Sequence, residues 1–345
     1  MKDKEFFKRH IEWLGHLLLA PARYLLHLFL ARKNWVFLYR AYGSGLGDAL
    51  AISVVLDALN QERPTRAIVF SKFPALFHAH PQVMLNLDYE RMPRLARSLL
   101  KSFAKYFRGR RVIHVGREKW LLGTRPWQVA PQDYGKPWIM QMIPDLPNGL
   151  PHLREATPGI HFDAGEIERY ACKFAHLPTG YAVVKASVGA NRPSGMAVKN
   201  WEHAGFQAVV DAVDLPWVQV GEAGEQRLAN TLDLLGQTSV REVLFVLSRA
   251  RLTLTVEGLV SHGGAAFGKP VVVVFSGFHD AHNLCYPNTR PVVAPRLPPC
   301  APCYLPIDGH CMTPGKPCTS AIDAAQVIAA VRAALSAPAP ADNRA

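Results

Sequence analysis

An acidic residue and, five positions later, a histidine lie between two apolar runs in the C-terminal half of the chain. The run Leu252–Val256 is rich in β-forming residues, Glu257 and Gly258 interrupt it, and Ser261–Phe267 has the small residues of a tightly packed helix. The unbroken apolar run Val271–Phe275 is typical of a buried parallel strand. A loop that leaves a parallel strand and enters a helix offers backbone N–H groups to phosphates. The pattern therefore predicts an anion site in an α/β domain.

A glycine-rich loop, Gly43–Asp48 (GSGLGD), lies near the start of the chain between a predicted strand, Trp35–Tyr42, and a predicted helix, Asp48–Asn60. Such a loop is one way to bind a dinucleotide. Its spacing is G-x-G-x-G, however, and the next predicted strand, Arg66–Ser71, is not followed by the acidic residue that would hold an NAD ribose. The pattern therefore disfavours a dehydrogenase. At a helix start, the simplest role for Asp48 is to cap the helix.

Four of the six cysteines lie within nineteen residues near the C-terminus, namely Cys300, Cys303, Cys311 and Cys318. In a cytosolic chain such spacing favours a metal over disulfides, because thiolates are soft ligands for Zn or Fe in tetrahedral sites. Only the first pair has tight ligand spacing, so reduced thiols without a metal remain the alternative.

The net charge of +12 is concentrated in residues 1–40 and 90–136, and the remainder is slightly acidic. The predicted helix Arg91–Arg108 gathers its cations within an arc of roughly 120° and its apolar residues opposite. The cations are Arg91, Arg94, Arg97, Lys101, Lys105 and Arg108; the apolar residues are Met92, Leu95, Leu99, Phe103, Tyr106 and Phe107. No acid occurs in residues 91–111, whereas a solvated face usually mixes signs. We therefore favour an anion-binding face over an ordinary solvated one.

The N-terminal segment, residues 1–33, mixes aromatic and leucine residues with cations, and Pro21 divides it. It is consistent with two short amphipathic helices on a bilayer surface, or with a helical hairpin packed on the protein's own core. No apolar run reaches the roughly 18 residues of a membrane span. Charged and polar residues also interrupt the apolar part expected of a signal peptide. We therefore expect a cytosolic protein with reduced thiols.

The remaining sequence predicts two α/β series of similar size. The irregular, proline-rich stretch 126–158 follows a strand at 111–115 and ends the first series. The second series is predicted to contain strands at 181–186 and 217–220, helices at 201–213, 225–234 and 240–248, and a last helix at 321–335. The tail, 336–345, is rich in alanine and proline and is expected to be disordered.

Four blocks, in this order, resemble those of the ADP-heptose:lipopolysaccharide heptosyltransferase family, over roughly residues 35–335. They are Gly45–Asp48; Lys199, Asn200 and Trp201; Leu235–Ser239; and the stretch from Glu257 through His262 to Phe275. The resemblance implies the α/β GT-B fold, with two Rossmann-like domains facing across a cleft. The domains are then residues 34–170, which bind the acceptor, and residues 171–335, which bind the nucleotide-sugar donor.

The resemblance also implies roles for individual residues. Asp48 matches the general base, and a positioned carboxylate suits a sugar hydroxyl, which is a poor nucleophile near neutral pH. Lys199 matches a lysine that contacts the donor pyrophosphate. Glu225, or else Glu222, matches a glutamate for the ribose hydroxyls. The remaining candidates are Arg192, Glu257, Gly258 and His262 for the donor, and Gly45, Gly47, Arg94, Arg97 and Lys101 for the acceptor. A role for His262 in its local backbone is the equal alternative to donor contact.

At one position the chain departs from the family, where Glu257, Gly258 and Leu259 replace the usual Asp, Ser/Thr and Gly. A longer carboxylate and a missing hydroxyl change the contacts near the diphosphate or the sugar, which leaves the donor open.

The sequence therefore predicts an inverting glycosyltransferase that moves a sugar, most simply heptose from ADP-heptose, to a lipopolysaccharide-core or related acceptor. Lys199 and loop amides would neutralise the leaving diphosphate, so no catalytic metal is required, and a structural Zn or Fe is expected at the cysteines. The basic segments favour an acidic, phosphorylated glycolipid at the inner leaflet, where the protein would be peripheral. Nucleic acid is disfavoured, because the aromatic residues lie opposite the basic face. Two alternatives remain: a protein O-heptosyltransferase with a metal-bound cysteine cluster, and a catalytically silent anion- or membrane-binding relative.

Overall fold

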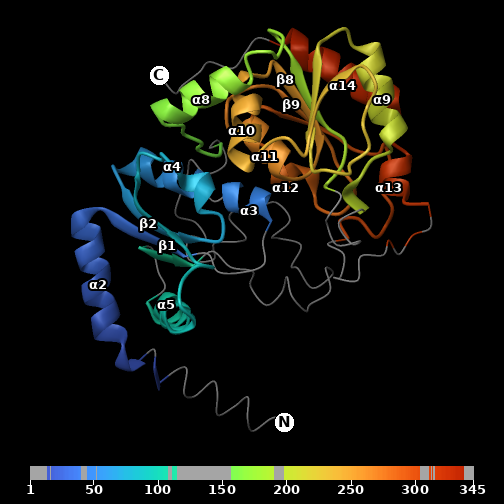
Figure 1. Cartoon of the computed structure of the whole chain (residues 1–345). Coiled ribbons are helices and arrows are strands. Elements are labelled where there is room, and N and C mark those ends of the chain that lie inside the picture. Colours follow the sequence, from blue (N-terminus) through green and yellow to red (C-terminus); the bar gives the residue numbers. More distant parts are fainter. Residues whose placement is uncertain are drawn as a thin grey trace.

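The chain folds around two separate β-sheets, each with helices on both faces (Figure 1). The computed structural model describes residues 14–15, 17–39, 45–51, 53–107, 111–114, 157–189, 198–303, 311, 313 and 315–337. Every strand pair among these residues is parallel. Because parallel strands align their carboxyl ends at one edge, the loops that leave the strands gather there.

The first sheet has the strand order β3-β2-β1-β4. Its strands are β1 (Trp35–Tyr39), β2 (Arg66–Ser71), β3 (Val83–Asp88) and β4 (Val112–His114). The side chains of β1 alternate between its faces, as expected of a strand. Val36 and Leu38 pack with α3 (Leu46–Ala51) and α4 (Ser53–Glu62), whereas Phe37 packs with α5 (Arg94–Tyr106). The helix α5 therefore covers the face of this sheet opposite α3 and α4.

The second sheet has the order β10-β9-β8-β5-β6-β7. Its strands are β5 (Ala182–Lys185), β6 (Trp217–Gly221), β7 (Thr231–Leu235), β8 (Leu252–Val256), β9 (Val271–Val274) and β10 (Thr289–Val292). One face packs with α9 (His203–Ala212) and α14 (Ala324–Ser336), and the other with α8 (Ala164–Lys173), α10 (Val240–Arg249) and α11 (Leu259–Ala265). Short elements complete this half: α12 (Ala281–Leu284) and α13 (Pro317–Ser320). Covering both faces buries β8 and β9 completely, which explains their unbroken apolar sequences.

Reciprocal caps determine where three helices of the second half begin. Ser239 accepts a hydrogen bond from the Glu242 backbone N–H, and the Glu242 carboxylate accepts one from the Ser239 N–H at the start of α10. The same box occurs at α8 with Asp163, and at α14 with Asp323. Each box satisfies two backbone donors that the first turn of a helix leaves without a partner.

The two halves share one hydrophobic core. A single cluster of buried side chains includes Leu38 of β1, Leu50 of α3, Leu244 of α10 and Val260 of α11. The helices α3 and α11 are in direct contact, and they lie beside each other between the two sheets in Figure 1. The sequence blocks that contain Gly45 and Glu257 therefore meet at the junction of the halves.

The structure corrects several predicted elements. The helix predicted at 225–234 is wrong: the strand β7 is there instead, and the loop before it turns at Gly224 with a positive φ of 85°. The predicted helix Asp48–Asn60 corresponds to α3 and α4, and residue 52 between them lies outside the described residues. The sequence reasoning also missed β3, β10 and α8, and α8 crosses the predicted domain boundary at residue 170 to pack on α10. The strands β2 and β8 have the predicted bounds.

The apolar side predicted for α5 is only partly buried. Ala104 is buried with Phe70, and Met92 and Leu100 pack against them, but Leu95 and Leu99 are 72% and 62% exposed. Part of the apolar side of α5 is therefore exposed to solvent.

The helix α2 (Ala20–Lys33) carries apolar residues around most of its circumference, so the amphipathic pattern predicted for the N-terminal segment is not confirmed. Only Leu30 is fully buried in it, whereas Tyr24, Leu25, Leu28 and Phe29 are exposed. Within the part of the chain that the structure describes, every helix is too short or too polar to cross a membrane. Residues 1–13, nearly all of the stretch 126–158, and the tail from 338 lie outside the described residues.

Candidate functional site

Polar side chains gather where three neighbouring strands of the second sheet end. The strands β8, β5 and β6 lie next to one another, and their chains continue into Glu257, into Ser187, and into Glu222 and Glu225. The parallel register brings these positions to the same edge of the sheet. Of the residues predicted to bind a donor, Glu222, Glu225 and Glu257 are thus placed along one edge.

Glu257 is buried in contact with two potential cations. Its Oε1 forms an ion pair with Lys199 Nζ and lies 2.7 Å from His279 Nδ1. The Lys199 ammonium also lies 4.4 Å from the centre of the Phe278 ring, a cation–π distance. Burial opposes ionisation of Glu257, but the charges and hydrogen bonds of His279 and Lys199 outweigh burial and hold its pKa well below the usual range. Glu257 is therefore a carboxylate at neutral pH.

One oxygen of Glu257 is unused by the protein. Among the described residues, Glu257 Oε2 is buried and accepts no hydrogen bond. A buried acceptor without a donor is unfavourable, so such an atom often marks a ligand position. A hydroxyl group of a bound ligand could donate to it, while Lys199 on the other oxygen would remain close to any nearby phosphate.

Glu225 is held firmly by its neighbours. Its Oε1 accepts from Lys185 Nζ at 2.6 Å and from the Glu222 backbone N–H at 2.7 Å, and its Oε2 accepts from Ser187 Oγ at 2.5 Å. The Glu225 side chain is buried, so these contacts fix the loop after β6 against the end of β5. Glu222, by contrast, lies against Gly189: a Cβ at that glycine would come within 2.7 Å of Glu222 Oε1.

The glycine-rich loop of the first half touches this edge directly. A Cβ built on Gly47 would lie 2.9 Å from His262 Cδ2, and 3.1 Å from the Gly258 carbonyl carbon and the Leu259 nitrogen. The first turn of α3 therefore packs closely against the start of α11, and only glycine allows this approach. His262 Nδ1 in turn lies 2.8 Å from the Tyr286 hydroxyl, which orients the ring. The structure thus brings Gly47, Gly258 and His262 together, with Gly45 two residues before Gly47.

The backbone places Asp48 one residue after Gly47 in the first turn of α3. The Asp48 side chain and the whole of Arg192 lie outside the described residues. Arg94, Arg97 and Lys101 are on α5, which covers the opposite face of the first sheet from α3. Arg97 lies 5.9 Å from the centre of the Tyr89 ring. The structure therefore does not bring these three cations to the junction where Gly47 lies.

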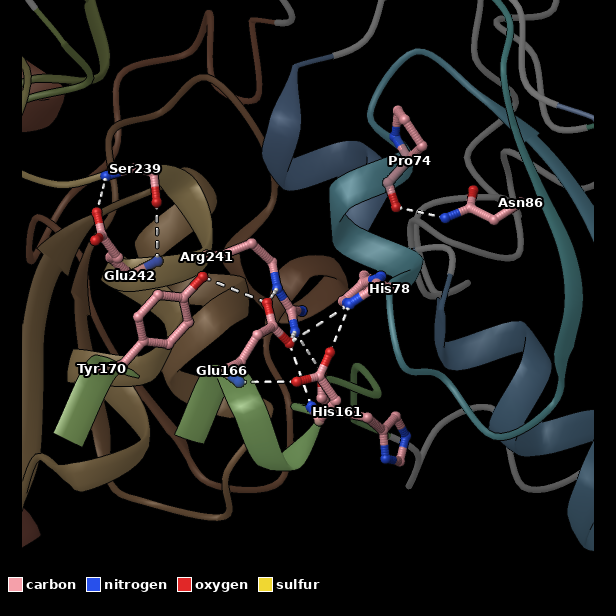
Figure 2. Close-up of polar contacts among 10 residues, drawn as sticks. Pro74, His78, Asn86, His161, Glu166, Tyr170, Ser239, Arg241 and Glu242 are labelled. Atoms are coloured by element: carbon pink, nitrogen blue, oxygen red, sulfur yellow. Dashed lines mark hydrogen bonds and ion pairs between the residues drawn. The ribbon is translucent and has the colours of Figure 1, made fainter. Parts of the chain in front are cut away.

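A second polar cluster links the halves and was missed by the sequence reasoning (Figure 2). Arg241 of α10 donates to Glu166 of α8 from two nitrogens, at 2.9 Å and 2.5 Å, and to the His161 carbonyl at 2.6 Å. His78, which follows the 3₁₀ helix η1 (Pro74–Phe77), lies 2.8 Å from Asp163. Burial raises and Arg241 lowers the pKa of Glu166, and the net direction is down. The available sequence signal was Asp163 three residues before Glu166, the spacing of a capping box.

The four predicted metal ligands surround one pocket. Cys300, Cys303, Cys311 and Cys318 line it together with Gly277 and Thr313. Cys300 Sγ lies 3.4 Å from Thr313 Oγ1, and Cys311 Sγ lies 3.2 Å from the Thr313 carbonyl oxygen. In the described part of the chain, two other groups have their possible ligand atoms within 4.8 Å of one another. The sulfur atoms of the four cysteines are not all within that distance. The four cysteines that were predicted from the sequence as metal ligands thus line the same pocket.

No family model matches the sequence, and no curated protein is recognisably similar to it. Solved structures are similar in fold. A glycosyl transferase family 9 protein from Veillonella parvula has a TM-score of 0.58 at 14% identity, covering 87% of this chain and 97% of its own. ADP-heptose lipopolysaccharide heptosyltransferase II from E. coli has a TM-score of 0.56 at 14% identity, covering 87% and 98%.

A third similar structure is TibC from enterotoxigenic E. coli, described as an iron-containing dodecameric glycosyltransferase. Its TM-score is 0.58 at 15% identity, and the alignment covers 87% of this chain and 75% of TibC. These likenesses confirm the predicted architecture. The chain has the fold of the family 9 glycosyltransferases, the GT-B arrangement of two Rossmann-like domains.

Proposed function

We propose that the protein is an inverting glycosyltransferase that uses a nucleotide-activated sugar, with ADP-heptose as the preferred donor. The observation that carries the proposal is the meeting of α3 and α11, where Gly47 lies against Gly258 and His262. With this contact, Asp48 would lie beside a loop that is suited to a diphosphate. The fold that the protein shares with heptosyltransferases supports glycosyl transfer as the class of reaction.

On the acceptor side, Asp48 would act as the general base. A carboxylate in the first turn of α3 would remove the proton from a sugar hydroxyl as that oxygen attacks the anomeric carbon of the donor. The bond from the anomeric carbon to the diphosphate breaks on the opposite side, so the configuration inverts. Gly45 and Gly47 would let the acceptor approach the backbone closely.

On the donor side, positive charge would stabilise the departing diphosphate. Lys199 is held beside Glu257, and the backbone N–H groups at the start of α11 add their partial charge. With these groups, and with Arg192 in the loop before Lys199, the reaction needs no divalent metal. The free oxygen of Glu257 would accept a hydrogen bond from a hydroxyl of the donor sugar.

The nucleoside would lie at the end of β6. Because Glu225 is already engaged by Lys185 and Ser187, its role would be to shape the loop and to accept a ribose hydroxyl as a further hydrogen bond. Glu222 is the alternative ribose contact. His262 is held by Tyr286, so it would order the junction more than it would bind the donor.

For the acceptor, we propose an acidic, phosphorylated glycolipid met at the inner leaflet. The helices α2 and α5 are joined by His27 Nε2, which lies 2.9 Å from the Phe107 carbonyl oxygen. Both carry exposed apolar residues, including Leu25, Leu28, Leu95 and Leu99. Exposed cations on the same helices, Arg32, Lys33, Arg94 and Lys101, would attract anionic lipid.

A protein O-heptosyltransferase is the second candidate, favoured by the pocket of four cysteines. The four thiols fit Zn or Fe in kind and number. Such an ion would tie the loop after β10 to α13 and stabilise the donor half, with no part in the chemistry. TibC, similar in fold, is described as iron-containing.

The two parts of the proposal have separate tests. A melting-shift screen of ADP-, GDP- and UDP-sugars should give its largest shift with an ADP-sugar, because a ligand that binds only the folded state raises the melting temperature. If no nucleotide sugar shifts the melting temperature, the proposal of a glycosyltransferase is rejected.

Elemental analysis tests the metal site and should show close to one Zn or Fe per chain. Cys303→Ser should lower both the metal content and the melting temperature. Metal-free protein of unchanged stability would reject the metal.

A further inference from the structure

The turn after β9 carries a histidine to which the proposed mechanism gives no role. Val274, the last residue of β9, pairs with Val256, the last residue of β8, so the chain leaves both strands at the same edge of the sheet. Glu257 follows β8 directly, and residues 275–279 turn back towards it. At the end of this turn, His279 Nδ1 lies 2.7 Å from Glu257 Oε1.

His279 belongs to a closed ring of four side chains. Glu257 forms an ion pair with Lys199, and the Lys199 ammonium lies 4.4 Å from the centre of the Phe278 ring. The rings of Phe278 and His279 meet edge to face, with centroids 4.4 Å apart and planes at 90°. Because His279 in turn contacts Glu257, each of the four side chains touches two others of the set. Lys199, Glu257 and His279 are nearly buried, so water competes little with these contacts.

The backbone of this turn is held by hydrogen bonds of its own. Ser276 Oγ accepts one from the Phe278 backbone N–H at 3.2 Å, and the Gly277 carbonyl accepts one from the Cys303 N–H at 2.8 Å. His279 is therefore presented by a turn that is fixed independently of Glu257. A side chain on such a support is suited to orient another side chain.

The hydrogen bonds to Glu257 decide which of its oxygens a ligand can reach. Burial raises the pKa of Glu257, but the charges and hydrogen bonds of His279 and Lys199 outweigh it, so Glu257 is ionised and its oxygens only accept. His279 Nδ1 and Lys199 Nζ are then both donors to Oε1, which has two lone pairs and is fully engaged. Oε2 is buried and accepts no hydrogen bond within the part of the chain that the structure describes, and it is left for a ligand.

Oε2 of Glu257 suits a hydroxyl group and disfavours a phosphate. A carboxylate repels the negative oxygens of a phosphate, whereas a sugar hydroxyl donates a hydrogen bond to it. Lys199, on the other oxygen of the same carboxylate, has the opposite preference. The pair therefore offers an acceptor for a hydroxyl beside a cation for a phosphate, as a sugar joined to a diphosphate requires.

We propose that His279 is a positioning residue that fixes Glu257 so that its Oε2 selects the sugar part of the donor. This role rests on the proposed glycosyltransferase function and adds a determinant of donor specificity to it. Glutamate has one more rotatable bond than the aspartate usual in the resembling family, so its carboxylate needs a further contact to stay in one orientation. Without His279, Lys199 alone would hold the carboxylate, which could then turn about its last side-chain bond.

Calorimetric titration of the full-length protein with ADP-heptose and with ADP tests this role, because ADP has the diphosphate but no sugar attached to it. His279→Leu should weaken ADP-heptose binding on the order of 10-fold, the low end of what a hydrogen bond to a charged group contributes, and leave ADP binding unchanged. A residue that only supports the fold would affect both ligands. Retained ADP affinity also shows that the donor half is folded.

His279→Asn is the matched variant. The asparagine NH₂ group can lie near the position of the histidine Nδ1 and donate to Glu257, so this variant should recover most of the affinity for ADP-heptose. If His279→Leu does not fold, His279→Ser replaces it, because serine is too short to reach Glu257.

Three results would overturn the role of His279 and leave the proposed function standing. They are an equal loss of affinity for ADP and ADP-heptose in His279→Leu, an ADP-heptose affinity in that variant close to the wild-type value, and a His279→Asn variant as weak as His279→Leu. If the wild type does not bind ADP-heptose, the proposed donor is wrong, and the role of His279 fails with it.

Discussion

Gly47 and His262 lie so close that a single added carbon atom would be 2.9 Å from the imidazole ring, although 215 positions separate them in the sequence. The same carbon would also meet the backbone of Gly258 and Leu259 at 3.1 Å. The end of a flexible side chain can move to another rotamer to make room for an added carbon atom, whereas these backbone atoms cannot. The contact therefore fixes the distance between α3 and α11, and with it the geometry of the proposed site.

Gly47→Ala should consequently weaken both stability and turnover. We expect a loss of about 1–3 kcal/mol in the free energy of unfolding, the usual effect of adding a methyl group to a close-packed contact. Gly258→Ala is the control for stability, because no atom lies within 4 Å of a Cβ there and its φ of 164° is extended backbone. Chemical denaturation compares the two. Equal stability would show that the junction adapts to the extra carbon.

Asp48→Asn should keep the size and shape of this side chain in the first turn of α3 and remove the proton acceptor. If Asp48 is the general base, turnover falls by roughly 10²–10⁴ while donor binding is unchanged. Steady-state kinetics and the donor-induced melting shift measure the two quantities separately. Turnover close to that of the wild type would mean that Asp48 is not the general base.

The Lys199–Glu257 pair should make stability depend on pH in a defined direction. The folded-state pKa of Glu257 is below its ordinary value of 4.5, so its contribution is complete above that pH and is lost as the pH falls through the folded pKa. Glu257→Gln leaves Lys199 and His279 without their carboxylate and should cost about 3–5 kcal/mol at pH 7. The difference between wild type and variant, measured by urea unfolding, should shrink below pH 4.5. A difference that stays constant with pH would show that the carboxylate is not stabilised by its neighbours.

Arg241→Met should strongly destabilise the protein, because Arg241 is a buried residue of α10. It leaves Glu166 buried without its guanidinium, and removing one partner of a buried pair costs about 3–5 kcal/mol. Lys173→Met breaks the pair with Glu242 on the same two helices, but there Lys173 is 45% exposed, so we expect a loss of at most about 1 kcal/mol. Thermal unfolding distinguishes them, and similar losses in both variants would contradict the burial of the Arg241–Glu166 pair.

The membrane proposal predicts that exposed leucines of α2 matter for lipid binding and not for folding. Leu25→Ser with Leu28→Ser should reduce co-sedimentation with anionic vesicles at low salt, while the melting temperature stays near that of the wild type. Leu232→Ser removes a similarly exposed leucine from β7 and should bind vesicles normally. Because Leu30 is buried, substitutions are preferable to deleting residues 1–33. If the wild-type protein does not sediment with these vesicles, α2 is not a membrane anchor.

The sequence alone determined the features that depend on local pattern. The apolar runs of β2 and β8 predicted those strands to the residue, because strands covered on both faces need continuous β-branched and aliphatic side chains. The resemblance of four ordered blocks to a known family implied the GT-B fold, which the similar solved structures confirm. Residues 231–234 were predicted as part of a helix, because a short leucine-rich run has no clear period. In the structure these residues form a strand, because they pair with β6.

Only the tertiary structure decided which of these residues act together. Contacts such as Gly47 with His262, Lys199 with Glu257, and Arg241 with Glu166 join residues that are 58 or more positions apart in the sequence, and no local pattern encodes them. Burial gives these side chains their chemistry, because removal from water forces each polar atom to find a partner within the protein or in a ligand. The packing of the two halves determines which side chains are buried, so this burial depends on the complete fold and not on any local stretch of sequence.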